Sequence, residues 1–135
     1  MTNSSAFLYR AGTILVPAGR TNHLHIICNN PVFYPIDGAS SVLAVNISTV
    51  RESSIYDGTC ILHRGDHPFV HHDSFVYYKD ATILKVARAD VLYREGSLIP
   101  KGQLSEDVFQ RVLKGFFESE EVTPRIMTFV KDFCL

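Results

Sequence analysis

The sequence predicts a single α+β domain in which short strands come first and helices come last. At 135 residues the chain has the commonest length of one domain. Short apolar runs separated by turn residues fill the first two-thirds, and the apolar spacing then changes to that of helices. Because strands and helices do not alternate regularly, a doubly wound sheet is not expected. We predict one domain over 1–135, with strands and loops over 6–103 and helices over 104–135.

Six segments of the first part are predicted to be strands. The segment 41–49 is the clearest, because Leu43 and Val45 fall on one face of an alternating pattern and Val42 and Ala44 on the other. The segment 31–40 contains two prolines and a glycine, so a loop or an irregular edge is expected there. The predicted strands cover 11–17, 23–28, 41–49, 59–63, 74–78 and 80–86, the first two forming a hairpin.

Two helices are predicted at the C-terminal end. The first follows Ser105, a suitable N-cap, and the second follows Thr123, with Pro124 in its first turn. Residues 88–94 are expected to add a short helical turn. The apolar residues of the first helix recur one turn apart, at Val108, Val112 and Phe116 and at Phe109, Leu113 and Phe117.

Composition restricts the classes of function. The net charge of −1 argues against a strongly basic surface for nucleic acids, although a small basic cleft is compatible with it. The three cysteines form no C-x-x-C pair, so the sequence contains neither a redox motif nor a zinc-ribbon motif. No secretory signal opens the chain, and no segment approaches the roughly 18 apolar residues that span a bilayer. A cytoplasmic protein without membrane contact is expected.

The segment 57–78 concentrates groups that bind metals or transfer protons. It holds four of the six histidines of the chain together with one cysteine. Pro68 excludes a helix that would align these histidines. A polar loop fixed by Pro68 is one interpretation, and a looped zinc site is another. The candidate zinc ligands are Cys60, His63, His67 and either His71 or His72.

Three stretches of the chain carry a family resemblance. The pair A-G-T-I-L-V-P and H-L-H-I-I-C is similar to the first β-hairpin of the PemK/MazF-like toxin family, and V-L-A-V-N-I-S-T resembles its third strand. The stretches D-S-F-V-Y-Y-K-D-A-T-I-L-K-V-A-R-A-D-V-L and K-G-Q-L-S-E-D-V-F-Q-R-V-L resemble the closing strand pair and the entry to the C-terminal helix. The likeness covers roughly residues 10 to 118. Two features depart from it: the family's G-x-R-P turn is A-G-R-T-N here, and the histidine-rich loop and last helix are additions.

The resemblance implies a fold and a function. The fold would be a small, mainly antiparallel SH3-like β-barrel with C-terminal helices. The function would be that of a homodimeric, toxin-like endoribonuclease of a toxin–antitoxin system, which cleaves single-stranded RNA without a metal or other cofactor and is bound by an antitoxin protein. Carried over by position, the catalytic candidates are Arg20 and Thr49, with Ser48 as an alternative to Thr49.

Other side chains are candidates on chemical grounds. Cleavage through a 2′,3′-cyclic phosphate needs proton transfer as well as a cation, and His67 or His72 would supply it from the rim of the same cleft. Exposed aromatic rings, with Tyr77 among the candidates, would stack on unpaired bases. The candidates for RNA binding are His23, His25, Asp73, Ser74 and Tyr77.

Two alternatives to the nuclease remain open on the sequence. One is a non-catalytic module on the same barrel that binds a protein, as the related CcdB-like toxins do. The other is a zinc-binding protein built on the cluster of residues 60–72. For His23 and His25, and for each loop histidine by itself, a structural role is the favoured interpretation, whereas a functional role is favoured for the loop as a group.

Overall fold

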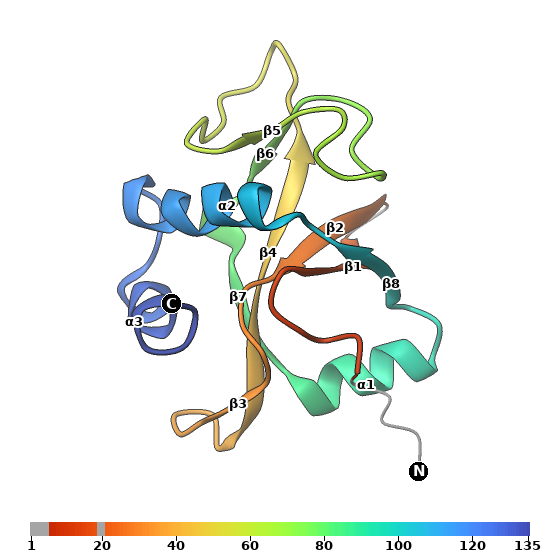
Figure 1. Cartoon of the computed structure of the whole chain (residues 1–135), viewed down its shortest axis with the longest axis vertical. Helices are drawn as coiled ribbons and strands as arrows, with labels where there is room; N and C mark the ends of the chain where they lie inside the picture. The colour runs from red at the N-terminus through yellow and green to blue at the C-terminus, as the bar shows by residue number, and fades with distance from the viewer. Residues whose placement is uncertain (1–5, 19–20) are drawn as a thin grey trace.

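The computed structural model describes residues 6–18 and 21–135. Within these ranges eight strands form one antiparallel sheet that curls into a half-barrel, and three α-helices and a short 3-10 helix accompany it (Figure 1). The strands are β1 (Gly12–Ala18), β2 (Thr21–Ile27), β3 (Val32–Tyr34), β4 (Ala39–Thr49), β5 (Ile61–Leu62), β6 (Ser74–Val76), β7 (Thr82–Lys85) and β8 (Ile99–Gln103). The helices are α1 (Val86–Arg94), α2 (Glu106–Glu118) and α3 (Pro124–Phe133), and the 3-10 helix η1 covers Tyr78–Asp80. The α+β class predicted from the sequence is therefore confirmed.

The long strand β4 is the centre of the sheet. The strand order is β5-β6-β4-β2-β1-β8, and β3 and β7 also pair with β4. The β2–β4 pairing extends only from Ile27 opposite Ala44 to His25 opposite Asn46. Beyond that point β4 pairs with β6, which lies on the opposite edge of β4 from β2, up to Thr49 opposite Ser74. The start of β2 and the end of β4 therefore separate, and the sheet is open between them.

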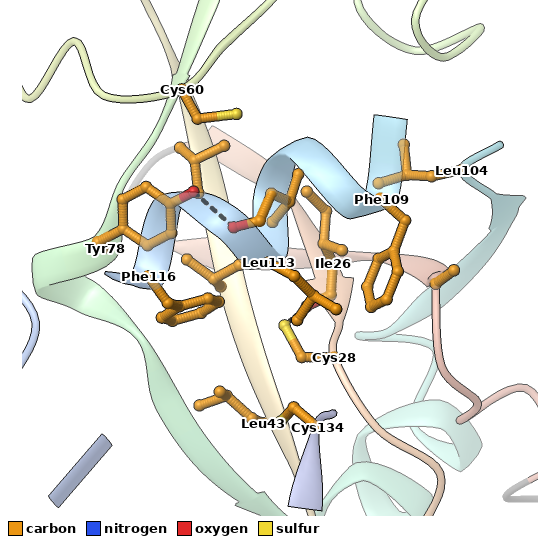
Figure 2. Packing of buried hydrophobic residues seen from close by; sticks show 14 of the residues in the cluster. Ile26, Cys28, Leu43, Cys60, Tyr78, Leu104, Phe109, Leu113, Phe116 and Cys134 are labelled. Atoms are coloured by element: carbon orange, nitrogen blue, oxygen red, sulfur yellow. Dashed lines mark hydrogen bonds between the residues drawn. The ribbon is translucent and has the colours of Figure 1, made fainter. Parts of the chain in front are cut away.

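Two apolar clusters cover the two faces of β4. One face, with Leu43 and Val45, packs beneath α2 and α3, and the other, with Val42 and Ala44, packs against Ala89 of α1. This division follows the two faces of the alternating pattern that the sequence shows over 41–49. Within the larger cluster, Tyr78 packs against α2 and its hydroxyl donates a hydrogen bond of 2.7 Å to the Val112 carbonyl (Figure 2).

The helix starts agree with the sequence. The Ser105 hydroxyl accepts from the Val108 amide at 3.3 Å, and the Thr123 hydroxyl accepts from the Ile126 amide at 3.3 Å. Each cap satisfies an amide that has no partner inside its own helix. The turn expected at 88–94 is the full helix α1, which begins at Val86.

Several strand expectations need correction. The segment 31–40 contains β3, which pairs with β4 and is followed by a turn at Gly38 with a positive φ of 64°. β8, which pairs with β1, was not expected, because all five of its residues are exposed and Pro100 and Gly102 interrupt the strand pattern. The strands expected at 59–63 and 74–78 are reduced to β5 and β6, and that expected at 80–86 to β7, with η1 before it.

Among the described residues, no helix is long and apolar enough to cross a membrane.

Candidate functional site

A pocket of about 220 Å³ lies where β2 and β4 separate. Its walls come from the start of β2, the end of β4, the loop at Phe69–His71 and the first residue of β6. The first residues of β2 and the last two of β4 are polar, and Leu24, Ile47, Phe69 and Val70 supply the apolar part of the lining. The polar groups that line the pocket are the hydroxyls of Thr21, Ser48, Thr49 and Ser74, the amide of Asn22, the rings of His23 and His71, and the guanidinium of Arg51.

His23 bridges the gap between the two strands. Its Nδ1 lies 3.3 Å from the Ile47 carbonyl oxygen, and its Nε2 lies 3.1 Å from the Thr21 hydroxyl. A carbonyl oxygen only accepts, so the proton belongs on Nδ1, and the Nε2 of the neutral ring keeps a lone pair that accepts from Thr21. The ring thus replaces a missing backbone partner of β4 and presents a basic nitrogen beside the pocket.

Arg51 supplies the positive charge of the pocket. It lies two residues beyond the end of β4, its side chain is exposed, and it makes no ion pair with the residues that the structure describes. A guanidinium with unused N–H groups can bind two oxygens of a phosphate or carboxylate at once. Sequence reasoning missed Arg51, although a cation just after a strand that ends in Ser48-Thr49 was a signal for it.

The loop contributes His71 rather than His72 to the pocket. The ring of His71 is exposed, lines the pocket and lies 6.3 Å from the ring of Phe69. His72, a catalytic candidate from the sequence, is exposed outside the pocket, and its carbonyl accepts from the Ser74 hydroxyl at 2.9 Å. The two rings are neighbours in the sequence, and only the path of the loop decides which of them faces the pocket.

His67, the other candidate for proton transfer, is buried away from the pocket. Its Nδ1 accepts from the Phe69 amide at 3.0 Å, and its Nε2 lies 2.9 Å from the Lys101 carbonyl and 3.0 Å from the Thr13 hydroxyl. Burial lowers the pKa of His67, although the hydrogen bond to Lys101 opposes that shift. Both nitrogens are engaged, so His67 fastens the histidine-rich loop to β1 and β8.

The remaining candidates lie in three places. Ser48, Thr49, Ser74 and His23 all line the pocket. His25 lies outside it, its Nδ1 2.9 Å from the His23 carbonyl, and burial lowers the pKa of its ring. Asp73 pairs at the surface with His63 at 2.9 Å. Arg20 lies outside the described residues; Thr21, the next residue in the sequence, lines the pocket.

The alternative zinc cluster is not assembled. Cys60 is buried, and that burial raises the pKa of its thiol, while His63 pairs with Asp73 and His67 bonds to the backbone of β8. Among the described residues, no three His, Cys, Asp or Glu side chains are placed to hold one metal ion. The structure therefore separates the ligands that the spacing of Cys60, His63, His67 and His71 suggested.

A second pocket of about 360 Å³ adjoins the first. Ser48, Thr49 and Arg51 line both, so these three residues form a ridge between them. The second pocket adds aromatic rings from Tyr56, Phe75 and Tyr77, and the cation of Lys79. Tyr77, expected to bind RNA, therefore lies in this pocket and not beside His23.

Comparisons of the chain with models of protein families, with curated proteins and with solved structures gave no significant match. The fold and the pocket define an α+β protein whose curled antiparallel sheet opens onto a polar, arginine-containing pocket.

Proposed function

We propose that this protein is a toxin-like endoribonuclease, related to the PemK/MazF-like toxins through an SH3-like barrel, which cleaves single-stranded RNA without a metal ion. One observation carries the proposal. The gap between β2 and β4 brings His23, Arg51 and the Ser48-Thr49 hydroxyls into one pocket. These are a base, a cation and hydrogen-bond donors, which are the groups that cleavage through a 2′,3′-cyclic phosphate requires.

The first half of the reaction is removal of a proton from the 2′-hydroxyl. The Nε2 lone pair of His23, which accepts from Thr21 in the free protein, takes that proton when the 2′-hydroxyl replaces the Thr21 hydroxyl. The Nδ1–H contact with the Ile47 carbonyl holds the ring in this tautomer and stabilises the imidazolium that forms. The freed 2′-oxygen attacks phosphorus, and a new O–P bond closes the cyclic phosphate.

The second half is departure of the 5′-oxygen. His71, on the loop side of the same pocket, donates a proton to that oxygen as its bond to phosphorus breaks. Arg51 binds two non-bridging phosphate oxygens, and the Ser48 and Thr49 hydroxyls donate to them. The negative charge that develops on the non-bridging oxygens is thereby stabilised by groups of the chain itself. Arg20 remains a sequence-based candidate for a second cation.

The experiment is incubation of the purified protein with a mixed-sequence single-stranded RNA in the presence of EDTA, followed by mapping of both ends. We expect 2′,3′-cyclic phosphate and 5′-hydroxyl ends, and loss of cleavage in the Arg20→Ala and Thr49→Ala variants with folding retained. RNA that stays intact at high concentrations of folded protein would overturn the proposal. A homodimer, an antitoxin partner and a cytoplasmic location belong to the same proposal.

A second candidate function is protein binding, and a separate feature favours it. An apolar groove of about 460 Å³ runs between the turn after β3 and α3, and the side chain of Ile36 at its edge is 73% exposed. Expression in a bacterial host separates the two functions. Growth inhibition that is abolished by Ile36→Asp but unchanged by Arg51→Ala would favour the binding module, whereas the reverse result favours the nuclease.

A further inference from the structure

We propose that the second pocket holds the unstacked base of the nucleotide next to the cleaved phosphate, against a wall formed by Tyr56, Phe75 and Tyr77. The inference rests on the proposed function for the identity of the substrate as single-stranded RNA. It adds a base-binding subsite to a pocket that would otherwise bind only a phosphate.

The wall is built from two parts of the chain. The ring of Tyr56, on the loop between β4 and β5, stacks on that of Phe75 of β6, with centroids 5.2 Å apart and planes 22° from parallel. The ring of Tyr77 meets Phe75 edge to face at 5.6 Å. The three rings thus form one continuous aromatic surface along the pocket.

This surface is not part of the apolar core. Val76 and Tyr78, which alternate with Phe75 and Tyr77, point into the core and are almost fully buried. Phe75 and Tyr77 are only partly buried on the opposite face, and Tyr56 is 38% exposed. Aromatic rings that stay partly open to solvent are the platforms on which unpaired bases stack.

The position of the wall joins it to the proposed cleavage site. In the β4–β6 register Phe75 lies opposite Ser48, and Ser74 lies opposite Thr49. Ser48, Thr49 and Arg51 line both pockets, so a phosphate bound at Arg51 has the aromatic wall on one side and His23 on the other. One strand of RNA can therefore cross the ridge with its phosphate at Arg51 and an adjacent base on the wall.

The charges of the second pocket favour a base over another phosphate. Asp57 and Glu121 line it together with Lys79. Burial raises the pKa of Asp57, but hydrogen bonds from Ser119 and Thr59 outweigh it and keep that pKa below its usual value. Once Arg51 binds the phosphate of the cleavage site, the two carboxylates outnumber Lys79 and disfavour a second phosphate, whereas they can accept from the N–H groups on the edge of a base.

The test uses the absence of tryptophan from the sequence. The Tyr56→Trp variant contains a single tryptophan in the proposed wall, and the Tyr93→Trp variant is the matched control. Tyr93 lies on α1 and is 41% exposed, and its ring centroid lies 4.8 Å from that of Phe7. Each variant is titrated with a single-stranded 2′-O-methyl oligonucleotide, whose blocked 2′-oxygen prevents cleavage. We expect saturable quenching in Tyr56→Trp, none in Tyr93→Trp, and none with a duplex of the same sequence.

A second substitution separates stacking from mere proximity. Phe75→Leu, introduced into the Tyr56→Trp variant, keeps an apolar side chain but removes the ring, and it should weaken oligonucleotide binding about tenfold. Equal quenching of both tryptophan variants, or an unchanged affinity after Phe75→Leu, would overturn the base site. Because the oligonucleotide cannot be cleaved, these results are independent of the nuclease. RNA cleavage without quenching would remove the base site alone, and quenching without cleavage would remove the nuclease alone.

Discussion

The two ends of strand β4 differ in how completely they are paired with other strands and covered by helices. Near its start, from Ser41 to Asn46, β4 is paired with other strands and covered by helices on both faces. Near its end, at Ile47–Thr49, β6 occupies one edge and β2 has separated from the other, where His23 bonds to the Ile47 carbonyl. One strand therefore provides both a rigid frame and an open pocket. The β2–β4 pairing therefore ends where the side chains of β4 begin to line the pocket.

The two consecutive tyrosines Tyr77 and Tyr78 show a similar contrast between a packed and an open environment. Tyr78 is buried, donates to the Val112 carbonyl and packs on Phe116, and burial raises its pKa far above the usual value. Tyr77 points to the other face, where it lines the second pocket. Two consecutive residues, Tyr77 and Tyr78, thus lie on opposite faces of the sheet. One face is packed in the core, and the other is the face that we propose binds RNA.

The largest effect is expected at the open end of β4, from His23→Gln. Glutamine can still donate to the Ile47 carbonyl but cannot take the proton of the 2′-hydroxyl. We expect kcat/KM for RNA cleavage to fall by a factor of about 10²–10⁴, with little change in the thermal melting temperature. The measurement is single-turnover cleavage of an end-labelled RNA. Cleavage at the wild-type rate would remove His23 from the mechanism and leave it as a strand-bridging residue.

The next effect is expected in the packed core beneath α2, from Gly115→Ala. A methyl group on Gly115 would overlap the hydroxyl of Tyr78, which is held by the backbone of α2. We expect a loss of about 1–3 kcal/mol in the free energy of unfolding, measured by urea denaturation. Lys114→Ala, at an exposed position on the same helix, is the control and should change stability by less than about 0.5 kcal/mol. A Gly115→Ala variant of unchanged stability would show that this part of the core is not tightly packed.

A smaller effect is expected from Tyr78→Phe, which removes the hydrogen bond to Val112 but keeps the ring. We expect a loss of about 1 kcal/mol in the free energy of unfolding, again by urea denaturation. Tyr77→Phe removes the matching hydroxyl on the pocket side and should leave stability unchanged. Equal losses in the two variants would contradict the difference between the two faces of the sheet.

The pH dependence of stability should carry a modest contribution from His67. Burial lowers its pKa in the folded protein, so the unfolded chain binds a proton more readily than the folded one. The stability linked to this group is complete above the unfolded pKa of about 6.5 and is lost as the pH falls below it. His67→Gln should therefore show a shallower loss of unfolding free energy between pH 7 and pH 5 than the wild type. The same slope in both proteins would place the acid sensitivity elsewhere, for example at His25, whose pKa is also lowered by burial.

Sequence patterns predicted the parts of the fold that depend on neighbouring residues. The alternation over 41–49 and the caps Ser105 and Thr123 are local signals, and β4, α2 and α3 follow them. β3 and β8 are strands only because β4 and β1 pair with them, and no alternating pattern marks them. Their existence depends on contacts that sequence spacing does not reveal.

The site divides in the same way. Ser48, Thr49, His23 and Ser74 lie at strand ends, and the sequence already drew attention to those ends. The place of each loop histidine depends on the path of the loop instead. The ring of His67 is held in a buried position by hydrogen bonds to the Thr13 hydroxyl and the Lys101 carbonyl. These partners lie 54 and 34 residues away in the chain. His71 enters the pocket because it lies on that same loop, whereas Arg51 enters it because it lies two residues beyond the end of β4.

The most direct test of the account is the cleavage rate of Arg51→Ala relative to Arg88→Ala. Both arginines are exposed. Arg51 lines the pocket at the end of β4, whereas Arg88 lies on α1, a helix that does not line this pocket (Figure 1). We expect Arg51→Ala to lower kcat about 10²–10³-fold and Arg88→Ala to cleave at the wild-type rate, with both variants equally stable. Equal rates for the two variants would contradict the claim that the gap beside β4 is where RNA is cleaved.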